Sequence, residues 1–323
     1  MRAVICDSFD GIDALRVGEM PEPGPIPGTA LVEVRAASVN FADTLMVSGR
    51  YQMKPEFPFS PGLEFAGVLE SADQVEGLVA GDRVCGFVGM GAMAERVVAF
   101  PGSLMKLPEG IGFEEGACIP VAYGTSYHAL VDRGRLQPGE TLLVLGAAGG
   151  VGMAAVEIGK LLGANVIAAV SSEEKAAAAR SAGADELIRY DQTPLRDGIA
   201  AVTSGEGVDV VYDPVGGEQS ELALRSTKWD GRLLVIGFAS GEIPSIPLNL
   251  SLVKGNSVIG VFWGRFNIEE PERSEANNQV IMDWAAEGRL HPVVQRAFPL
   301  DQAAQALRWV AERKVIGRVV ITP

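Results

Sequence analysis

The chain has 323 residues, of which 47% are hydrophobic and 21% are charged, and its formal net charge is −14 at pH 7. This length and apolar content allow a large buried core and favour two domains of ordinary size. The excess of negative charge repels polyanions, which argues against a nucleic acid as the main partner.

Two further classes are disfavoured. No apolar run approaches the roughly 18 residues of a membrane span, and the first residues lack a basic region followed by an apolar core. We therefore expect a cytoplasmic protein with no membrane partner. The three cysteines, Cys6, Cys85 and Cys118, are far apart and odd in number, which argues against a disulfide framework and against a Cys-x-x-Cys metal lobe. We expect them to be small buried groups.

Residues 1 to about 120 show the signals of a β-rich domain. Alternating apolar and polar residues at 30–36 predict a half-exposed strand. It follows a turn-forming segment, 21–28, that holds four prolines and two glycines. Further short strands are predicted around 67–70, 83–87 and 96–100.

The stretch 142–162 predicts a strand, a tight turn and a helix. The apolar run 142–145 is short enough for a buried parallel strand, and after Gly152 the apolar period becomes helical. Gly149, Gly150 and Gly152 let the backbone approach a ligand at the helix N-terminus, where an anion such as a pyrophosphate binds favourably. Ala147 replaces the first glycine of the dinucleotide fingerprint, so an ordinary glycine-rich turn is the alternative. The α/β units that follow favour a cofactor loop.

The next strand, predicted at 164–170, is followed by Ser171, Ser172 and a serine-capped helix. An NAD enzyme usually has an acidic side chain at this strand end, and that carboxylate would repel a 2′-phosphate. Two hydroxyls with Lys175 one turn later suit a phosphate, so the sequence favours NADPH. The alternative for Lys175 is a solvated residue paired with a carboxylate, and the neighbouring Glu173 and Glu174 argue against a phosphate site.

Two more strands are predicted at 208–213 and 232–237. Ligands of open α/β sheets bind beyond the carboxyl ends of the strands, so the loops 213–217 and 237–239 are expected to border the cofactor. Simple strand-end turns are the alternative. The segment 257–264 has the character of an apolar edge strand. The charged and polar segment 269–278 is expected to be an exposed loop or a helix start. A helix at 300–312 and a strand at 318–321 are expected to return to the first domain.

The loops 38–51 and 61–67 resemble those of the medium-chain dehydrogenase/reductase superfamily. The zinc alcohol dehydrogenases of that superfamily place a cysteine in the first loop and G-H-E-x-x-G in the second. Here Leu63 stands at the histidine position, and the first loop has Asn40 and Asp43 but no cysteine. Zinc needs three or four N, S or O ligands, and the two histidines, His128 and His291, lie in no such cluster. We therefore predict no metal site, with Glu64 as a buried, hydrogen-bonded carboxylate.

Loss of the metal ligands narrows the resemblance to the zinc-free quinone oxidoreductase branch, over nearly the whole chain. The matching segments are 40–43, 48–51, 80–84, 124–125 and 147–152, and enoyl-thioester and alkenal reductases share many of them. The resemblance implies an α/β protein with a Rossmann doubly wound parallel-sheet domain at 121–260. It also implies a β-rich GroES-like catalytic domain at 1–120 that is completed by 261–323.

The resemblance also implies roles for individual residues. Matches of Lys175, Tyr190 and Arg313 contact the 2′-phosphate in that family. Tyr51 is the candidate proton donor or hydrogen-bond partner of the substrate carbonyl, with a tyrosine that only shapes the cleft as the alternative. Asn40 and Thr125 are expected to orient the nicotinamide and the substrate. The full set expected at the cofactor is Ala148, Gly149, Gly150, Val151, Ser171, Ser172, Lys175, Tyr190, Gly216, Phe238, Phe262, Trp263 and Arg313.

The resemblance further suggests that the strand in 257–264 pairs with its mate in a second subunit and that its aromatic residues line a pocket. Closure as a two-fold homodimer would protect an apolar edge strand from uncontrolled association. Ordinary core packing is the alternative for Phe262 and Trp263.

The sequence therefore predicts a zinc-independent, NADPH-dependent oxidoreductase that reduces quinones. An NADPH-dependent 2-enoyl thioester or alkenal reductase is the nearest alternative, and a thioester carrier would need basic side chains at the cleft mouth, for which Arg50, Lys54 and Arg265 are candidates. An NADPH-binding sensor or structural protein with little turnover is the alternative of another class.

Overall fold

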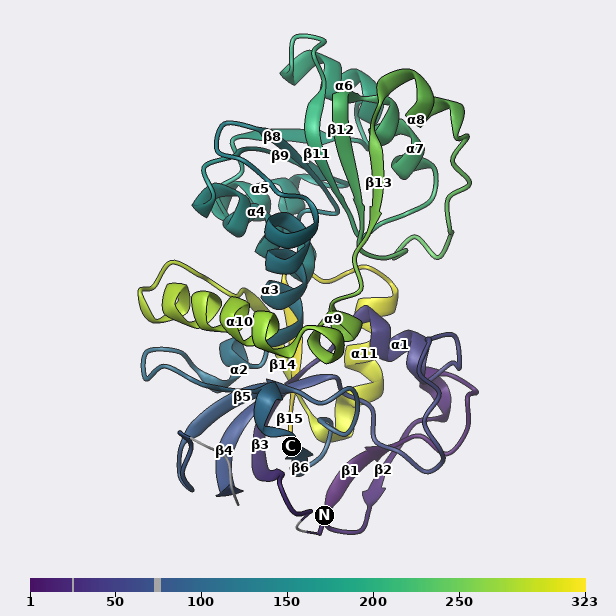
Figure 1. Cartoon of the computed structure of the whole chain (residues 1–323). Coiled ribbons are helices and arrows are strands. Elements are labelled where there is room, and N and C mark those ends of the chain that lie inside the picture. The colour runs from purple at the N-terminus through teal and green to yellow at the C-terminus, as the bar shows by residue number, and fades with distance from the viewer. Residues whose placement is uncertain (25, 73–76) are drawn as a thin grey trace. The chain divides into compact units, whose positions relative to one another are not determined.

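The structure is a computed structural model that describes residues 1–24, 26–72 and 77–323 (Figure 1). The chain forms two compact units. The discontinuous unit comprises Met1–Val121 and Glu270–Pro323, and the central unit comprises Ala122–Glu269. The boundary predicted after residue 260 therefore falls inside the central unit. The turn segment predicted at 21–28 includes Pro25, which lies outside the described residues.

The discontinuous unit is built on a seven-stranded sheet with the order β14-β15-β3-β4-β5-β7, in which β6 also pairs with β3. β14 and β15 are parallel, and the other pairs are antiparallel. A separate hairpin joins β1 and β2. The strands of this unit are β1 (Arg2–Ile5), β2 (Arg16–Glu19), β3 (Ala30–Ser38), β4 (Glu64–Ala72), β5 (Arg83–Phe87), β6 (Arg96–Ala99), β7 (Leu104–Lys106), β14 (Val294–Pro299) and β15 (Arg318–Thr322).

The helices of this unit connect and cover these strands. They are η1 (Ile12–Ala14), α1 (Phe41–Met46), η2 (Pro101–Ser103), α2 (Phe113–Gly116), α10 (Pro271–Ala286), η4 (Leu300–Gln302) and α11 (Ala303–Ala311). β3 alternates buried and partly exposed residues along its first half, as the period-2 pattern predicted. Its end pairs with the C-terminal strand, Ser38 opposite Val320, so the last residues of the chain complete the core that the first residues begin.

The central unit is a six-stranded, fully parallel sheet with the order β10-β9-β8-β11-β12-β13. Its strands are β8 (Thr141–Leu145), β9 (Asn165–Val170), β10 (Glu186–Arg189), β11 (Val208–Asp213), β12 (Thr227–Val235) and β13 (Ser257–Gly260). Its helices are α3 (Pro120–Tyr127, which enters from the first unit), the π-helical η3 (His128–Arg133), α4 (Gly150–Leu161), α5 (Glu173–Ser181), α6 (Leu195–Val202), α7 (Glu218–Arg225), α8 (Asn249–Lys254) and α9 (Trp263–Glu269). The strand order reverses between β8 and β11, which is where doubly wound sheets open a ligand crevice.

The structure refines two local predictions. The strand expected in 257–264 is β13, which ends at Gly260, and Trp263 begins α9. Trp263 is 7% exposed, and its indole ring packs against Gly124 so closely that a methyl group there would lie 2.6 Å from it. For 269–278 the sequence predicted an exposed loop or a helix start, and the structure has the helix start, since α10 begins at Pro271 and continues to Ala286. In the part of the chain that the structure describes, no helix is long and apolar enough to cross a membrane.

Candidate functional site

The carboxyl ends of the parallel strands in the central unit meet at one edge of the sheet, and the candidate nucleotide residues of this unit are distributed over the loops there. The loop after β8 contains the glycine cluster. The loop after β9 contains the two serines, and the loops after β11 and β12 contain Gly216 and Phe238. The parallel topology therefore brings together segments that are far apart in the sequence.

The glycine loop has the close packing that a phosphate-binding turn requires. α4 begins at Gly150, with Gly149 in extended conformation at its N-cap and no side chain capping it. A methyl group on Gly152 would lie 2.3 Å from the carbonyl oxygen of Gly146, so only glycine allows the helix to approach the strand end. The amides of the first turn have no intrahelical acceptor and can serve a bound anion.

A buried pair of hydroxyls supports this helix start, and no pattern in the sequence predicts it. The Ser126 hydroxyl donates to the carbonyl of Val151 (3.0 Å) and lies 2.8 Å from the Tyr212 hydroxyl. Both side chains are fully buried, and burial raises the pKa of Tyr212. The pair therefore connects α3, α4 and β11 beneath the glycine loop.

At the end of β9, hydroxyl and ammonium groups lie together. The Ser172 hydroxyl accepts from the Lys175 amide (3.3 Å) and caps α5, as predicted. The Lys175 ammonium donates to the Ser171 hydroxyl (3.2 Å). The Tyr190 amide donates to the Val170 carbonyl (3.1 Å), which places Tyr190 beside the same strand end. This cluster, Ser171, Ser172, Lys175 and Tyr190, is called the strand-end cluster below.

Asp213 organises the loop after β11, a role that the sequence analysis missed. One carboxylate oxygen accepts from the amides of Val215 and Gly216 (2.9 Å each), and the other accepts from the Ser220 hydroxyl (2.5 Å). Gly216 has φ +75°, and a methyl group there would lie 2.9 Å from the Phe238 ring. The loops after β11 and β12 thus pack against each other, as expected for two loops that border one ligand. An aspartate directly before Pro-Val-Gly-Gly is the local signal that could have indicated this role.

Of the remaining residues predicted in the central unit, Thr125 lies in α3, partly exposed. Trp263 is buried against that same helix, which supports core packing over direct ligand contact, whereas Phe262 is 54% exposed. Arg313 belongs to the discontinuous unit, where it follows α11 with φ +56°.

In the discontinuous unit, the two resembling loops are joined by a buried ionic network. The Glu64 carboxylate, fully buried, accepts from the Asn40 amide nitrogen (3.0 Å) and from the Val121 backbone amide (2.8 Å). The Arg318 guanidinium donates to the same carboxylate and to the Ser38 hydroxyl (2.9 Å). These residues, Ser38, Asn40, Glu64 and Arg318, are called the Glu64 network below.

Asp43 forms a second buried connection between the same loops. Its carboxylate accepts from the amides of Asn40 (2.7 Å) and Gly62 (3.1 Å). Burial raises the pKa of Asp43 to about 7, although the two amides and the Arg318 charge oppose that effect. Burial also lowers the pKa of Arg318 to about 10, so this guanidinium remains a cation at neutral pH. Asn40 is only 5% exposed and is committed to these contacts.

Tyr51 follows α1 in the same unit. Its amide donates to the Leu45 carbonyl (3.2 Å), and its side chain is half-buried against the core. Burial, with a smaller contribution from the negative charge of Asp43, raises the pKa of the Tyr51 phenol. The hydroxyl is therefore protonated at neutral pH and suited to donating a hydrogen bond.

Leu63 and His128 are each engaged in contacts within their own unit. Leu63 is 3% exposed and belongs to the core of the discontinuous unit. The His128 ring lies 2.7 Å from the Asp132 carboxylate and stacks on Phe266. Among residues 1–24, 26–72 and 77–323, no three His, Cys, Asp or Glu side chains form a group that could hold a metal ion.

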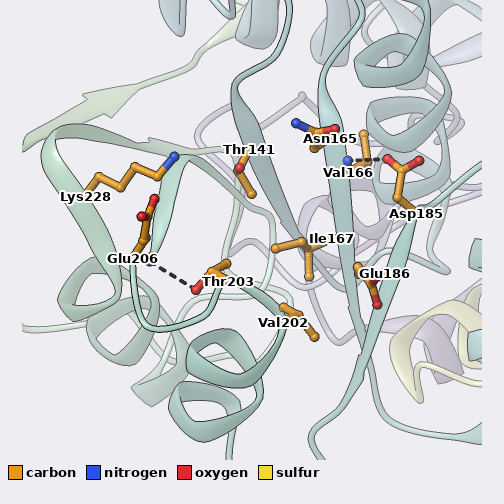
Figure 2. A pocket seen from close by; sticks show the side chains of 11 residues that line it. Thr141, Asn165, Val166, Ile167, Asp185, Glu186, Val202, Thr203, Glu206 and Lys228 are labelled. Carbon is orange, nitrogen blue, oxygen red and sulfur yellow. Dashed lines mark hydrogen bonds between the residues drawn. The ribbon is translucent and has the colours of Figure 1, made fainter.

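A cavity of about 240 Å³ lies at the opposite edge of the central sheet (Figure 2). Its lining residues include Thr141, Asn165 and Glu186, which stand at the amino ends of β8, β9 and β10. Lys228 at its rim pairs with Asp209 (2.8 Å), and Asp185 accepts from the Val166 amide (2.7 Å). These contacts stabilise the strand starts, and the cavity is separate from the nucleotide edge.

Comparisons with known proteins agree with this architecture. The family model "Alcohol dehydrogenase GroES-like domain" matches residues 26–109, and "Zinc-binding dehydrogenase" matches residues 150–279. The chain is 38% identical to mouse quinone oxidoreductase-like protein 2, over 99% of the chain and 92% of that protein.

Two solved structures extend the likeness to the fold. A probable oxidoreductase from Mycobacterium abscessus is 37% identical, with a TM-score of 0.90, over 100% of this chain and 99% of that chain. The Escherichia coli quinone oxidoreductase complexed with NADPH is 28% identical, with a TM-score of 0.92, over the whole of both chains. The central unit thus has the Rossmann-like parallel sheet, and the discontinuous unit has the GroES-like fold. The chain belongs to the medium-chain dehydrogenase/reductase superfamily of oxidoreductases, among the quinone oxidoreductase-like proteins.

Proposed function

We propose that the chain is an NADPH-dependent, zinc-independent reductase whose acceptors are quinones. The observation that carries the cofactor assignment is the strand-end cluster, where two serine hydroxyls and the Lys175 ammonium stand at the position that NAD enzymes give to a carboxylate. The NADPH complex of the E. coli quinone oxidoreductase supports the same assignment. Zinc independence is supported by the buried Leu63 at the histidine position.

The residues of the central unit fit NADPH in kind and place. The amides at the start of α4 would hold the pyrophosphate, the strand-end cluster would hold the 2′-phosphate, and the loops with Gly216 and Phe238 would border the cofactor. We propose Arg313 as a further phosphate contact and Phe262 as a lining residue. The chemistry that bound NADPH supplies is hydride donation from nicotinamide C4.

In the discontinuous unit, Tyr51 is proposed to donate a hydrogen bond to the substrate carbonyl and to stabilise negative charge that develops on its oxygen. Its protonated phenol suits this role. The side-chain amide of Asn40 donates to Glu64, so Asn40 would act indirectly, by fixing the start of α1. Thr125 is proposed to orient the nicotinamide.

The function is tested by the loss of NADPH absorbance with metal-free protein and a panel of a benzoquinone, a naphthoquinone, a 2-alkenal and a crotonyl thioester, with NADH in parallel. Quinone turnover with NADPH preferred is the expected result. Turnover confined to the alkenal or thioester would instead assign an enone or enoyl-thioester reductase, the second candidate, which the half-buried Tyr51 favours. NADPH binding without turnover of any acceptor would favour a sensor or structural protein.

Lys175→Glu is expected to weaken NADPH binding by about 10- to 100-fold, because it replaces a charged hydrogen bond to the phosphate with repulsion. NADH binding should change far less, since NADH has no 2′-phosphate. The measurement is the dissociation constant of each cofactor by fluorescence titration. Arg180→Glu, which inverts a charge at the last turn of the same helix, is the control. An equal loss for both cofactors would remove Lys175 from the phosphate site.

Tyr51→Phe is expected to lower enone reduction by about 100-fold, because the enolate oxygen loses its donor. Quinone reduction should fall much less, since the reduced quinone can take its protons from solvent. Steady-state rates for a 2-alkenal and a benzoquinone with the same protein sample compare the two reactions. Identical decreases for both substrates would show that the hydroxyl only shapes the cleft.

We also propose that the protein is a homodimer that pairs through β13. This edge strand exposes Val258 (47%), and the nearby α8 exposes Leu252 and Val253. Val258→Asp should convert the dimer to a monomer, because it places a charge on the paired edge. Sedimentation velocity measures the mass, with Val79→Asp, an exposed position of the discontinuous unit, as the control. A monomeric wild type would contradict the proposal.

A further inference from the structure

Arg189 stands beside the strand-end cluster through the register of the sheet. It is the last residue of β10 and pairs with Val170, the last residue of β9. The chain continues from Val170 directly into Ser171 and Ser172. The backbone of Arg189 therefore lies one strand spacing, about 4.8 Å, from that of Val170, the residue directly before Ser171.

The Arg189 guanidinium reaches across to the first residue of α5. One terminal nitrogen donates to the Glu173 carboxylate (2.6 Å), and the remaining face binds Asp191 through two hydrogen bonds (3.2 and 2.7 Å). The Arg189 side chain is 22% exposed and that of Glu173 is 76% exposed. An ion pair this exposed contributes little to folding stability.

The negative charge of Glu173 is unfavourable for binding a phosphate at this strand end. It directly follows Ser172, and its charge lies within the first turn of α5, where Lys175 also belongs. An acidic side chain released at this strand end would compete for the Lys175 ammonium and for ribose hydroxyls, as the carboxylate of an NAD enzyme does, and it would repel a 2′-phosphate.

We propose that Arg189 is a specificity-determining residue, which favours a 2′-phosphorylated cofactor by holding Glu173 in an ion pair, although it shares its charge with Asp191. Arg189 acts through Glu173, and Lys175 makes the direct contact with the phosphate. The inference rests on the proposed NADPH function and deepens it, because it explains how the site tolerates an acidic residue beside the serine cap.

The test uses calorimetric binding of 2′,5′-ADP and 5′-AMP to the full-length protein, so no acceptor substrate is needed. Arg189→Gln is expected to weaken 2′,5′-ADP by roughly 5- to 20-fold while 5′-AMP stays within about twofold, since only the former carries the second phosphate. The difference should shrink in 0.5 M NaCl, because these groups are exposed to solvent. Arg180→Gln removes a positive charge from the far end of α5 and is the matched control.

The double variant Arg189→Gln/Glu173→Gln decides the mechanism. Once Glu173 is neutral, loss of Arg189 should change 2′,5′-ADP binding by no more than about twofold relative to Glu173→Gln alone. The proposal would be overturned if Arg189→Gln weakened 2′,5′-ADP binding as much in the Glu173→Gln background as in the wild type. It would also be overturned if the affinities for both nucleotides fell equally, or if the effect were no larger than that of Arg180→Gln. A wild type that does not prefer 2′,5′-ADP would overturn the NADPH assignment as well, whereas a wild-type preference that Arg189→Gln leaves intact would overturn the role of Arg189 alone.

Discussion

Replacing Arg318 with Met is expected to lower the free energy of unfolding by about 3 to 5 kcal/mol, because it leaves a buried carboxylate without its cation. Glu64 is fully buried and Arg318 is 7% exposed, so water cannot replace the lost partner. The remaining donors to Glu64, from Asn40 and Val121, are neutral. Urea unfolding at pH 7 measures the change as a lower midpoint at an unchanged slope.

Two further variants separate the ion pair from general packing. Arg318→Met/Glu64→Gln should be less destabilised than Arg318→Met, because residue 64 then carries no buried charge that has lost its partner. Arg308→Met removes the exposed partner of Asp13 and should change stability by no more than about 1 kcal/mol. If Arg318→Met were as mild as Arg308→Met, the Glu64 network would not be a main stabiliser of the discontinuous unit.

Replacing Gly152 with Val is expected to weaken NADPH binding by about 100-fold, which corresponds to roughly 2.7 kcal/mol. The added side chain would collide with the backbone of Gly146 and Ala147, and backbone cannot yield as a flexible side chain does. The start of α4 would then move away from the end of β8, and its amides would no longer converge on the pyrophosphate. Fluorescence titration with NADPH gives the affinity.

The same substitution should also destabilise the central unit by about 1 to 3 kcal/mol through overpacking. Gly102→Ala is the control, because a methyl group there meets nothing within 4 Å. Cofactor affinity equal to that of the wild type in a folded Gly152→Val protein would show that the phosphate does not bind at this helix start.

The elements of the central unit could be predicted because their determinants are local. The run 142–145 and the glycines after it predicted β8 and the start of α4. The Ser172 hydroxyl caps α5 by accepting a hydrogen bond from the amide of Lys175, only three residues later. The run 208–213 coincides with β11. The end of the strand in 257–264 could not be predicted, because an apolar run that includes aromatic residues fits a strand as well as a buried helix. The strand ends at Gly260, and Trp263 packs on Gly124, which is far away in the sequence.

The sequence by itself determined the family, the parallel-sheet unit, the glycine loop and the replacement of a zinc ligand by Leu63, since each of these is carried by residue identity and short spacing. Only the tertiary structure decided which charges meet. Arg318 and Glu64 are 254 positions apart, and Arg189 at the end of β10 reaches Glu173, which follows the neighbouring strand β9. No periodicity encodes such pairs, because a long side chain takes its partner from strand register and burial, which exist only once the chain has folded.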